Sequence, residues 1–260
     1  AWGIYLRCHD DIGWAIDDSD AARMGFSGHE HRMFLADYFT GHFYGSDARG
    51  ADFQVDAVSG ERRTSGTAAS LAGIEAAKES GDTGRLQRAI DRYICAYSMV
   101  FGFGGIPLLY MGDEVGLFND WSFEQNPEKV ADNRWLHRPA MNWEVAEAAA
   151  NGQLGQTTAG QIRERMQRLI DTRRRLASLH ASVASKVRAG RGQGIAIFDR
   201  NHPAGNLVQV YNLNETNRFV GVDELNGLHS QVIDELTGTH LHLGEGLSLA
   251  PYEVRWLRQL

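Results

Sequence analysis

Two short apolar runs limit what this chain can fold into, because each is followed at once by acidic residues. Residues 2–6 lead into Asp10 and Asp11, and residues 106–111 lead into a second pair of acids. A continuous apolar run of this length is typical of a strand buried in a parallel sheet. The carboxyl ends of parallel strands lie on one edge of the sheet, where α/β folds gather their functional side chains. The sequence therefore predicts an α/β protein with a polar site at that edge.

The segments around these runs predict two strand–helix units. Residues 83–103 and 158–179 each carry apolar side chains at helical spacing, with arginines on the opposite face. Residues 12–82 separate the first strand from its helix and are far longer than an ordinary connection, so we expect a mainly helical insertion that shapes a pocket. We interpret 1–11 and 83–179 as the last two βα units of a (β/α)8 barrel.

The pattern changes after residue 180. Short apolar runs of four or five residues, separated by Gly, Asn and Pro, replace the helical spacing. The clearest of these runs are 194–198, 207–211, 219–222, 232–233 and 254–257. We therefore predict that 180–260 forms an antiparallel β-sandwich domain.

Composition narrows the possible partners. The formal net charge of −7 argues against nucleic acid and anionic membranes, and no apolar run is long enough to span a bilayer. The two cysteines, Cys8 and Cys95, are expected to be free thiols, and no metal-binding spacing is present. The chain begins at Ala1 without a signal pattern, so we expect it to be cut from something longer, and its cellular location stays open.

Several motifs together resemble one family. The chain is similar to the C-terminal part of α-amylase-family (glycoside hydrolase family 13) enzymes, and specifically to the amylosucrase and sucrose hydrolase group. The resemblance covers essentially the whole chain and is carried by Arg-Cys-His-Asp-Asp-Ile-Gly-Trp at 7–14, Gly-Thr-Ala-Ala-Ser-Leu at 66–71, and the segments 105–114, 132–139 and 249–257.

The resemblance implies roles for the first motif. Retaining glycosidases use a carboxylate nucleophile and a general acid around an oxocarbenium-like transition state. Asp10 matches a third carboxylate of the family, which stabilises that transition state, and His9 would bind the same sugar hydroxyls. Asp11 would pair with Arg134 and close the pocket beyond one glucosyl unit. The motifs of the nucleophile and the general acid are not in these 260 residues, so we expect the N-terminal half of the same enzyme to be required.

The resemblance also implies substrates. Arg32 and Arg63 match arginines that hold the acceptor glucan, although each could equally be an ordinary solvated arginine. We expect sucrose as the glucosyl donor, an α-glucan or water as the acceptor, and no cofactor and no metal. Two alternatives remain: an α-glucosidase or trehalose-synthase-like relative, indicated by the segment 139–143, and a non-catalytic glucan-binding or structural fragment.

Overall fold

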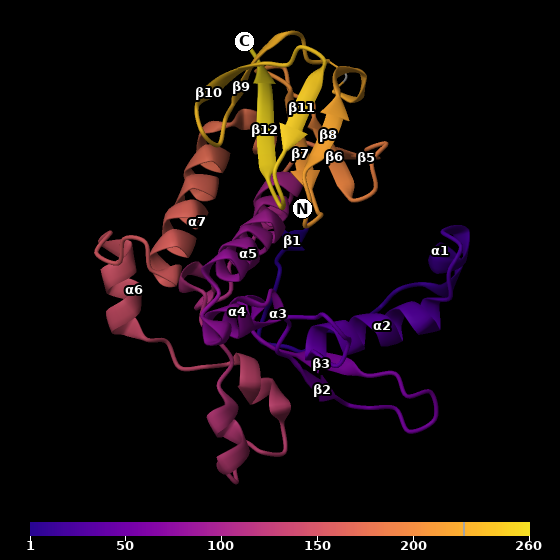
Figure 1. Cartoon of the computed structure of the whole chain (residues 1–260), viewed down its shortest axis with the longest axis vertical. Helices are drawn as coiled ribbons and strands as arrows, with labels where there is room; N and C mark the ends of the chain where they lie inside the picture. Colours follow the sequence, from indigo (N-terminus) through magenta and orange to yellow (C-terminus); the bar gives the residue numbers. More distant parts are fainter. Residues whose placement is uncertain (226) are drawn as a thin grey trace. The chain divides into compact units, whose positions relative to one another are not determined.

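The computed structural model describes residues 1–225 and 227–260, which form two compact units (Figure 1). Unit 1 comprises Ala1–Leu6, Ile90–Leu109 and Gly155–Leu260, and unit 2 comprises Arg7–Ala89 and Tyr110–Leu154. The division predicted from the sequence, with 1–11 and 83–179 in a barrel, 12–82 as an insertion and 180–260 as a β domain, stays a prediction.

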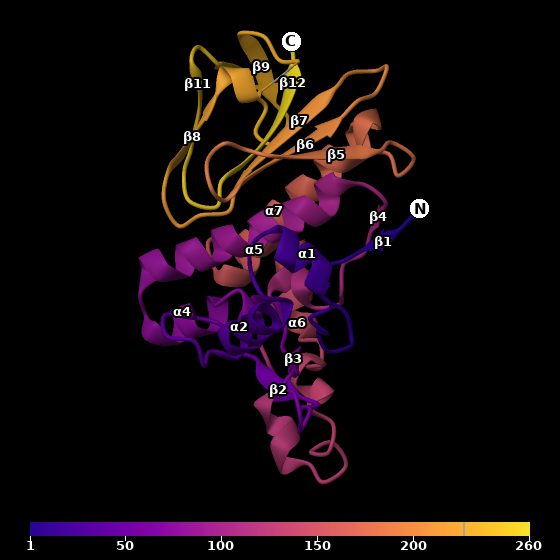
Figure 2. The same ribbon diagram turned by 90° about the vertical axis from the view of Figure 1, so that its right-hand side faces the viewer.

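Antiparallel strands dominate the C-terminal part of unit 1 (Figure 2). One sheet has six strands in the order β10-β9-β12-β7-β6-β5, and a second sheet pairs β11 with β8. The bounds are β5 Ser185–Ala189, β6 Ile195–Arg200, β7 Leu207–Asn212, β8 Arg218–Gly221, β9 Gln231–Asp234, β10 Thr239–His242, β11 Gly246–Leu249 and β12 Val254–Gln259. The predicted antiparallel β domain is therefore confirmed.

An apolar core lies between these two sheets. Ile197 and Val210 on the larger sheet and Val220 and Leu247 on the smaller sheet belong to one cluster of buried side chains. Alternate residues of a strand face opposite sides of a sheet, so the apolar positions of both sheets can meet in one layer. The domain is accordingly a β-sandwich.

Two long helices lie wholly or mostly in unit 1. α5 (Thr83–Phe103) begins in unit 2 and continues into unit 1 from Ile90, and α7 is Thr158–Arg175. Cys95 on α5 packs with Tyr211 of β7 on the outer face of the larger sheet. The helical spacing predicted α5 at these bounds and predicted α7 with the same start. Within the described residues, none of the helices is both long and apolar enough to cross a membrane.

The predicted parallel strands are present but short. β1 (Gly3–Ile4) and β4 (Ile106–Pro107) pair in parallel, and the amides of Ile106 and Leu108 donate to the Trp2 and Ile4 carbonyls at 2.8 Å each. The prediction that these strands are fully buried is wrong here, since Trp2 is 84% exposed and Ile106 is 53% exposed. A parallel pair cannot cover its own two faces, which are normally buried under helices and further strands.

Unit 2 consists of short helices around a hairpin. Its α-helices are α1 Asp18–Arg23, α2 Gly28–Thr40, α3 Ala68–Leu71, α4 Ile74–Ser80 and α6 Trp143–Ala150, and its 3₁₀ helices include Asn133–His137. β2 (Ala51–Phe53) and β3 (Arg63–Ser65) form an antiparallel hairpin in contact with α2. The sequence predicts a loop over 46–66, because strands of three residues leave too little alternation to recognise.

Candidate active site

The predicted site residues all lie in unit 2. The segment that follows β1 runs beside β3: Ile12 and Thr64 exchange two backbone hydrogen bonds of 2.8 and 3.0 Å. The indole of Trp14 donates to the Thr64 hydroxyl at 3.1 Å and stacks on Phe39, with ring centroids 5.2 Å apart. These contacts fix the segment from 9 to 14 against the hairpin.

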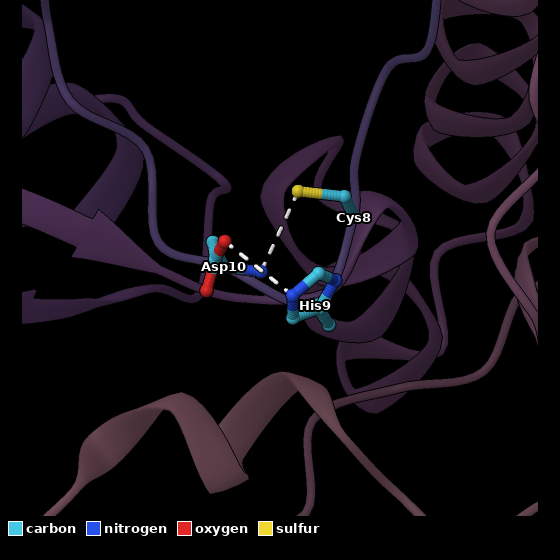
Figure 3. A group of neighbouring side chains, drawn as sticks. All are labelled: Cys8, His9 and Asp10. Carbon is cyan, nitrogen blue, oxygen red and sulfur yellow. Dashed lines mark hydrogen bonds and ion pairs between the residues drawn. The ribbon is translucent and has the colours of Figure 1, made fainter.

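Asp10 presents a half-exposed carboxylate beside three cationic or polar side chains. Its Oδ1 lies 3.6 Å from Arg134 Nη1 and 3.8 Å from Arg138 Nη2. Its Oδ2 lies 3.5 Å from His9 Nε2, a contact that Figure 3 shows. The side chain of Asp10 is 52% exposed. A carboxylate held in this way can accept hydrogen bonds from sugar hydroxyls, and guanidinium groups of Arg134 and Arg138 can donate further ones.

The backbone on both sides of Asp10 is held by side chains from elsewhere in unit 2. Arg7 is buried, and its Nη2 donates to the Asp10 carbonyl at 2.8 Å while its Nε donates to the Gly66 carbonyl at 2.9 Å. Arg138 Nε donates to the His9 carbonyl at 2.8 Å. Two peptide carbonyls next to the Asp10 side chain are therefore fixed by charged donors, which form stronger hydrogen bonds than neutral ones.

A buried histidine completes these contacts. The backbone amide of Gly66 donates to His137 Nδ1 at 3.3 Å, and His137 Nε2 lies 3.1 Å from the His9 carbonyl. Burial, together with the positive charge of Arg7, lowers the pKa of His137 to about 4. The ring is therefore neutral at pH 7, with its proton on Nε2, where it can donate to His9.

Asp11 has a different partner from the predicted one. Its carboxylate is only 3% exposed, and Oδ2 accepts a hydrogen bond of 2.9 Å from Arg63 Nη1. Arg134 instead forms a two-pronged pair with Asp132, at 2.8 Å from both Nε and Nη2. This hydrogen bond raises the pKa of Arg134, and the charges of Asp132, Asp10 and Asp11 add to the effect. The predicted Asp11–Arg134 pair is thus replaced by Asp11–Arg63 and Asp132–Arg134.

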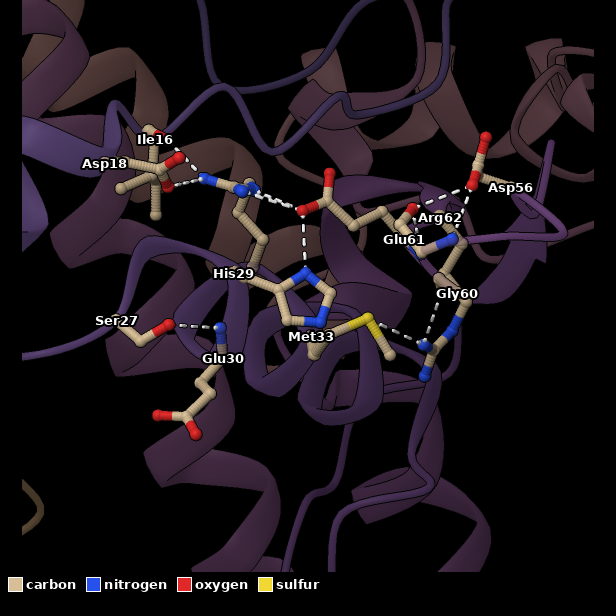
Figure 4. Close-up of polar contacts among 12 residues, drawn as sticks. Ile16, Asp18, Ser27, His29, Glu30, Met33, Asp56, Gly60, Glu61 and Arg62 are labelled. Carbon is tan, nitrogen blue, oxygen red and sulfur yellow. Dashed lines mark hydrogen bonds and ion pairs between the residues drawn. The ribbon is translucent and has the colours of Figure 1, made fainter.

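Arg32 is engaged by protein groups. Its Nη1 donates to Asp18 Oδ1 and to the Ile16 carbonyl at 2.7 Å each, and its Nε and Nη2 donate to Glu61 Oε1 at 2.9 and 2.7 Å. His29 Nδ1 lies 2.9 Å from the same oxygen of Glu61 (Figure 4). These hydrogen bonds from Glu61 and Asp18 raise the pKa of Arg32.

Arg32 and Arg63 still line one small cavity of about 290 Å³, together with Gly13, Trp14 and Glu61. Most donors of Arg32 serve the fold, whereas the Arg63 side chain is 52% exposed. Of the two predicted acceptor arginines, Arg63 is therefore the better placed to reach a ligand.

Sequence reasoning missed several residues around the site. Arg7, His137 and Arg138 lie within the quoted motifs, but their roles depend on backbone carbonyls that no residue pattern reveals. Arg62 pairs with Asp37 and Asp52, with a distance of 2.7 Å from its Nε to Asp52 Oδ1. The Arg-Arg doublet at 62–63 was the available signal.

One group of side chains in the described part of the chain could supply three metal ligands. Atoms of Cys8, His9 and Asp10 all lie within 4.8 Å of one another. Asp10 is already beside two guanidinium groups, which compete with a cation for its oxygens. The expectation that the site works without a metal stays a prediction.

Two features together define the class of protein. The segment His9-Asp10-Asp11 follows a strand of a parallel pair, and an antiparallel β-sandwich forms the C-terminal end of the chain. Residues 185–258 match the model of the family described as "Amylosucrase, C-terminal domain". Over 181 residues the chain is 23% identical to glucosylglycerate phosphorylase of Escherichia coli (strain K12). The matched region covers 70% of this chain and 30% of that relative.

Two solved structures share the fold. AmyP, as a variant in complex with maltotriose, matches with a TM-score of 0.52 and 16% identity over 74% of this chain and 38% of AmyP. AmyP in complex with maltose matches with a TM-score of 0.50 and 17% identity over 65% of this chain and 35% of AmyP. The chain thus spans about a third of the length of these relatives. The resemblance to the C-terminal part of α-amylase-family enzymes is confirmed.

Proposed function

We propose that this chain is the C-terminal portion of a retaining, sucrose-cleaving α-glucosyl transferase of the α-amylase family. The intact enzyme transfers the glucosyl unit of sucrose to an α-glucan, or to water, and releases fructose. The observation that carries the proposal is the geometry of Asp10, a half-exposed carboxylate on a backbone that is held on both sides and faces Arg134 and Arg138.

Each site residue then has a role. As positive charge develops on the sugar ring, Asp10 holds the sugar hydroxyls more tightly than in the ground state, which lowers the barrier. His9 donates to the same hydroxyls. Arg63 and Arg134, anchored by Asp11 and Asp132, bind further hydroxyls of the sugar. Arg32 supports the wall of the small cavity that Arg63 also lines, through its hydrogen bonds to Glu61.

β1 and β4 are, in this proposal, two neighbouring strands of the (β/α)8 barrel, with α5 in the connection between them. The nucleophile and the general acid lie on strands that precede Ala1 in the full enzyme. The exposed apolar side chains of Trp2 and Ile106 support this, because they are the groups that further strands and helices of a barrel would cover.

The experiment compares the 260-residue chain with the full-length gene product, each incubated with sucrose. Fructose is expected only from the full-length enzyme, and Asp10→Asn should lower its kcat by about 100- to 1,000-fold. Asp171→Asn, which changes an acid in unit 1, is the control. Fructose release by the 260-residue chain alone, or full activity of Asp10→Asn, contradicts the proposal.

A second candidate is a phosphorylase, in which phosphate takes the glucosyl unit. The match to glucosylglycerate phosphorylase favours it, and Arg134 and Arg138 near Asp10 could attract an anion. Supplying the full-length enzyme with sucrose, then with sucrose plus phosphate, separates the two. Glucose 1-phosphate as the main product indicates a phosphorylase, and a growing glucan or free glucose indicates the transferase or the hydrolase.

A further inference from the structure

His137 is a buried titratable side chain near Asp10. It is 1% exposed, and both ring nitrogens face backbone groups rather than side chains. An amide N–H can only donate and a carbonyl can only accept, so Nδ1 must be the acceptor from Gly66 and Nε2 must carry the proton toward His9. The two contacts leave one protonation state that satisfies both.

These contacts join two segments that are far apart in the sequence. Gly66 lies at the end of the β2–β3 hairpin, and the His9 carbonyl belongs to the peptide bond that immediately precedes Asp10. Arg7 donates to both Gly66 and Asp10 from the same region. The rotation of the peptide before Asp10 is therefore set by His137 and Arg138, and that of the following peptide by Arg7.

We propose that His137 is a positioning residue for Asp10, acting as a neutral clamp between the Gly66 amide and the His9 carbonyl. This inference rests on the proposed function, in which the Asp10 carboxylate must meet the sugar hydroxyls in the transition state. Because the clamp acts on the backbone, it leaves the carboxylate free for substrate. A displacement of about 1 Å at such a group can cost about 100-fold in rate.

A protonated His137 ring could not form both of these hydrogen bonds. Protonation at Nδ1 removes the acceptor for the Gly66 amide and places a third positive charge beside Arg7 and Arg138. The clamp needs an acceptor on one edge and a donor on the other, and the neutral imidazole holds both in one rigid ring.

Two substitutions test the clamp because each keeps one half of it. In His137→Gln the amide nitrogen takes the place of Nε2 and can still donate to His9. In His137→Asn the amide oxygen takes the place of Nδ1 and can still accept from Gly66, but nothing reaches His9. His202→Asn and His202→Gln in unit 1 are the matched controls.

With the full-length enzyme and sucrose, we expect His137→Asn to lower kcat by about tenfold or more with a smaller change in KM, and His137→Gln to keep kcat within about threefold. A purely structural role instead predicts similar losses in both variants, in proportion to their loss of stability. Equal kcat values for the two variants, measured where both are folded, overturn the proposal.

A second measurement does not depend on turnover. In the ¹⁵N-labelled full-length enzyme, we expect the His137 ring to carry its proton on Nε2, and His137→Asn to shift the amide signals of Asp10 and Asp11 more than His137→Gln does. A proton on Nδ1, or unchanged Asp10 signals in His137→Asn, overturns the clamp. An absence of sucrose turnover in the wild-type enzyme counts against the proposed function only.

Discussion

Acid should destabilise unit 2 through His137. In the unfolded chain this histidine has an ordinary pKa near 6.5, whereas burial and the charge of Arg7 lower it to about 4 in the folded protein. Between these two pH values the unfolded state binds a proton that the folded state does not. The free energy of unfolding therefore rises with pH across this window: the contribution of His137 is complete above pH 6.5 and is lost as the pH falls toward 4.

The two pKa values set the size of the effect. Each pKa unit corresponds to about 1.4 kcal/mol, so the interval from 6.5 to 4 gives about 3 kcal/mol of pH-dependent stability. This is a large share of the 5–15 kcal/mol that is typical of a whole domain. At pH 4, unit 2 should therefore unfold at a clearly lower urea concentration than at pH 7.

Urea unfolding of wild type and His137→Gln at several pH values between 4 and 7.5 measures this contribution. Four of the six tryptophans, at positions 14, 121, 135 and 143, lie in unit 2, so their fluorescence reports on it. Subtracting the free energy of unfolding of the variant from that of the wild type at each pH removes the effect of all other titrating groups. The difference should grow by about 3 kcal/mol from pH 4 to pH 7. If the free energies of unfolding of the two proteins change with pH by the same amount, the reasoning is refuted.

Three further predictions concern unit 1. Gly102→Ala should destabilise it by about 1–3 kcal/mol in urea unfolding although alanine favours helices, because the added Cβ would lie 2.5 Å from Gln209 Nε2 and 2.6 Å from the Tyr211 hydroxyl; an unchanged midpoint contradicts this. Cys95, whose pKa burial raises to about 12, should resist thiol reagents at pH 8 until the protein unfolds, so rapid labelling of both cysteines in the native state counts against it. Arg200→Met should lower the free energy of unfolding by about 3 kcal/mol or more in urea unfolding, because the buried guanidinium donates to three backbone carbonyls and one hydroxyl. A loss below about 1 kcal/mol contradicts this.

Elements with a strong pattern could be predicted from the sequence. α5 combines a buried stripe with an arginine-rich face over 21 residues, and its predicted bounds, Thr83–Phe103, agree with the structure. β7 is buried along its whole length, and the apolar run at 207–211 predicts it equally well. β5, with its lysine and arginine, and β11, with a glycine and a serine, carry few apolar residues. They pair only because the neighbouring strands β6 and β8 are in place.

The partner of Asp11 shows why the site was harder to predict. A sequence lists carboxylates and guanidinium groups but does not say which of them meet, and the family resemblance pointed to Arg134. In the structure, the bridge between Ile12 and Thr64 brings β3 beside this segment and places Arg63 next to Asp11. Because the sequence predicts a loop over the hairpin that contains β3, it gives no sign that Arg63 is the neighbour of Asp11.

The two adjacent aspartates differ in what the fold leaves free. Asp11 is 3% exposed and is committed to Arg63, so its negative charge acts on a ligand only through that guanidinium, which is half exposed. Asp10 is 52% exposed, and the strongest contacts around it are made to backbone carbonyls rather than to its carboxylate. A group that must bind a developing positive charge needs a fixed position and unoccupied lone pairs, and holding the backbone provides both. In the proposed function the two aspartates of the motif therefore have different roles: Asp11 fixes the Arg63 guanidinium, and the Asp10 carboxylate remains available to the substrate.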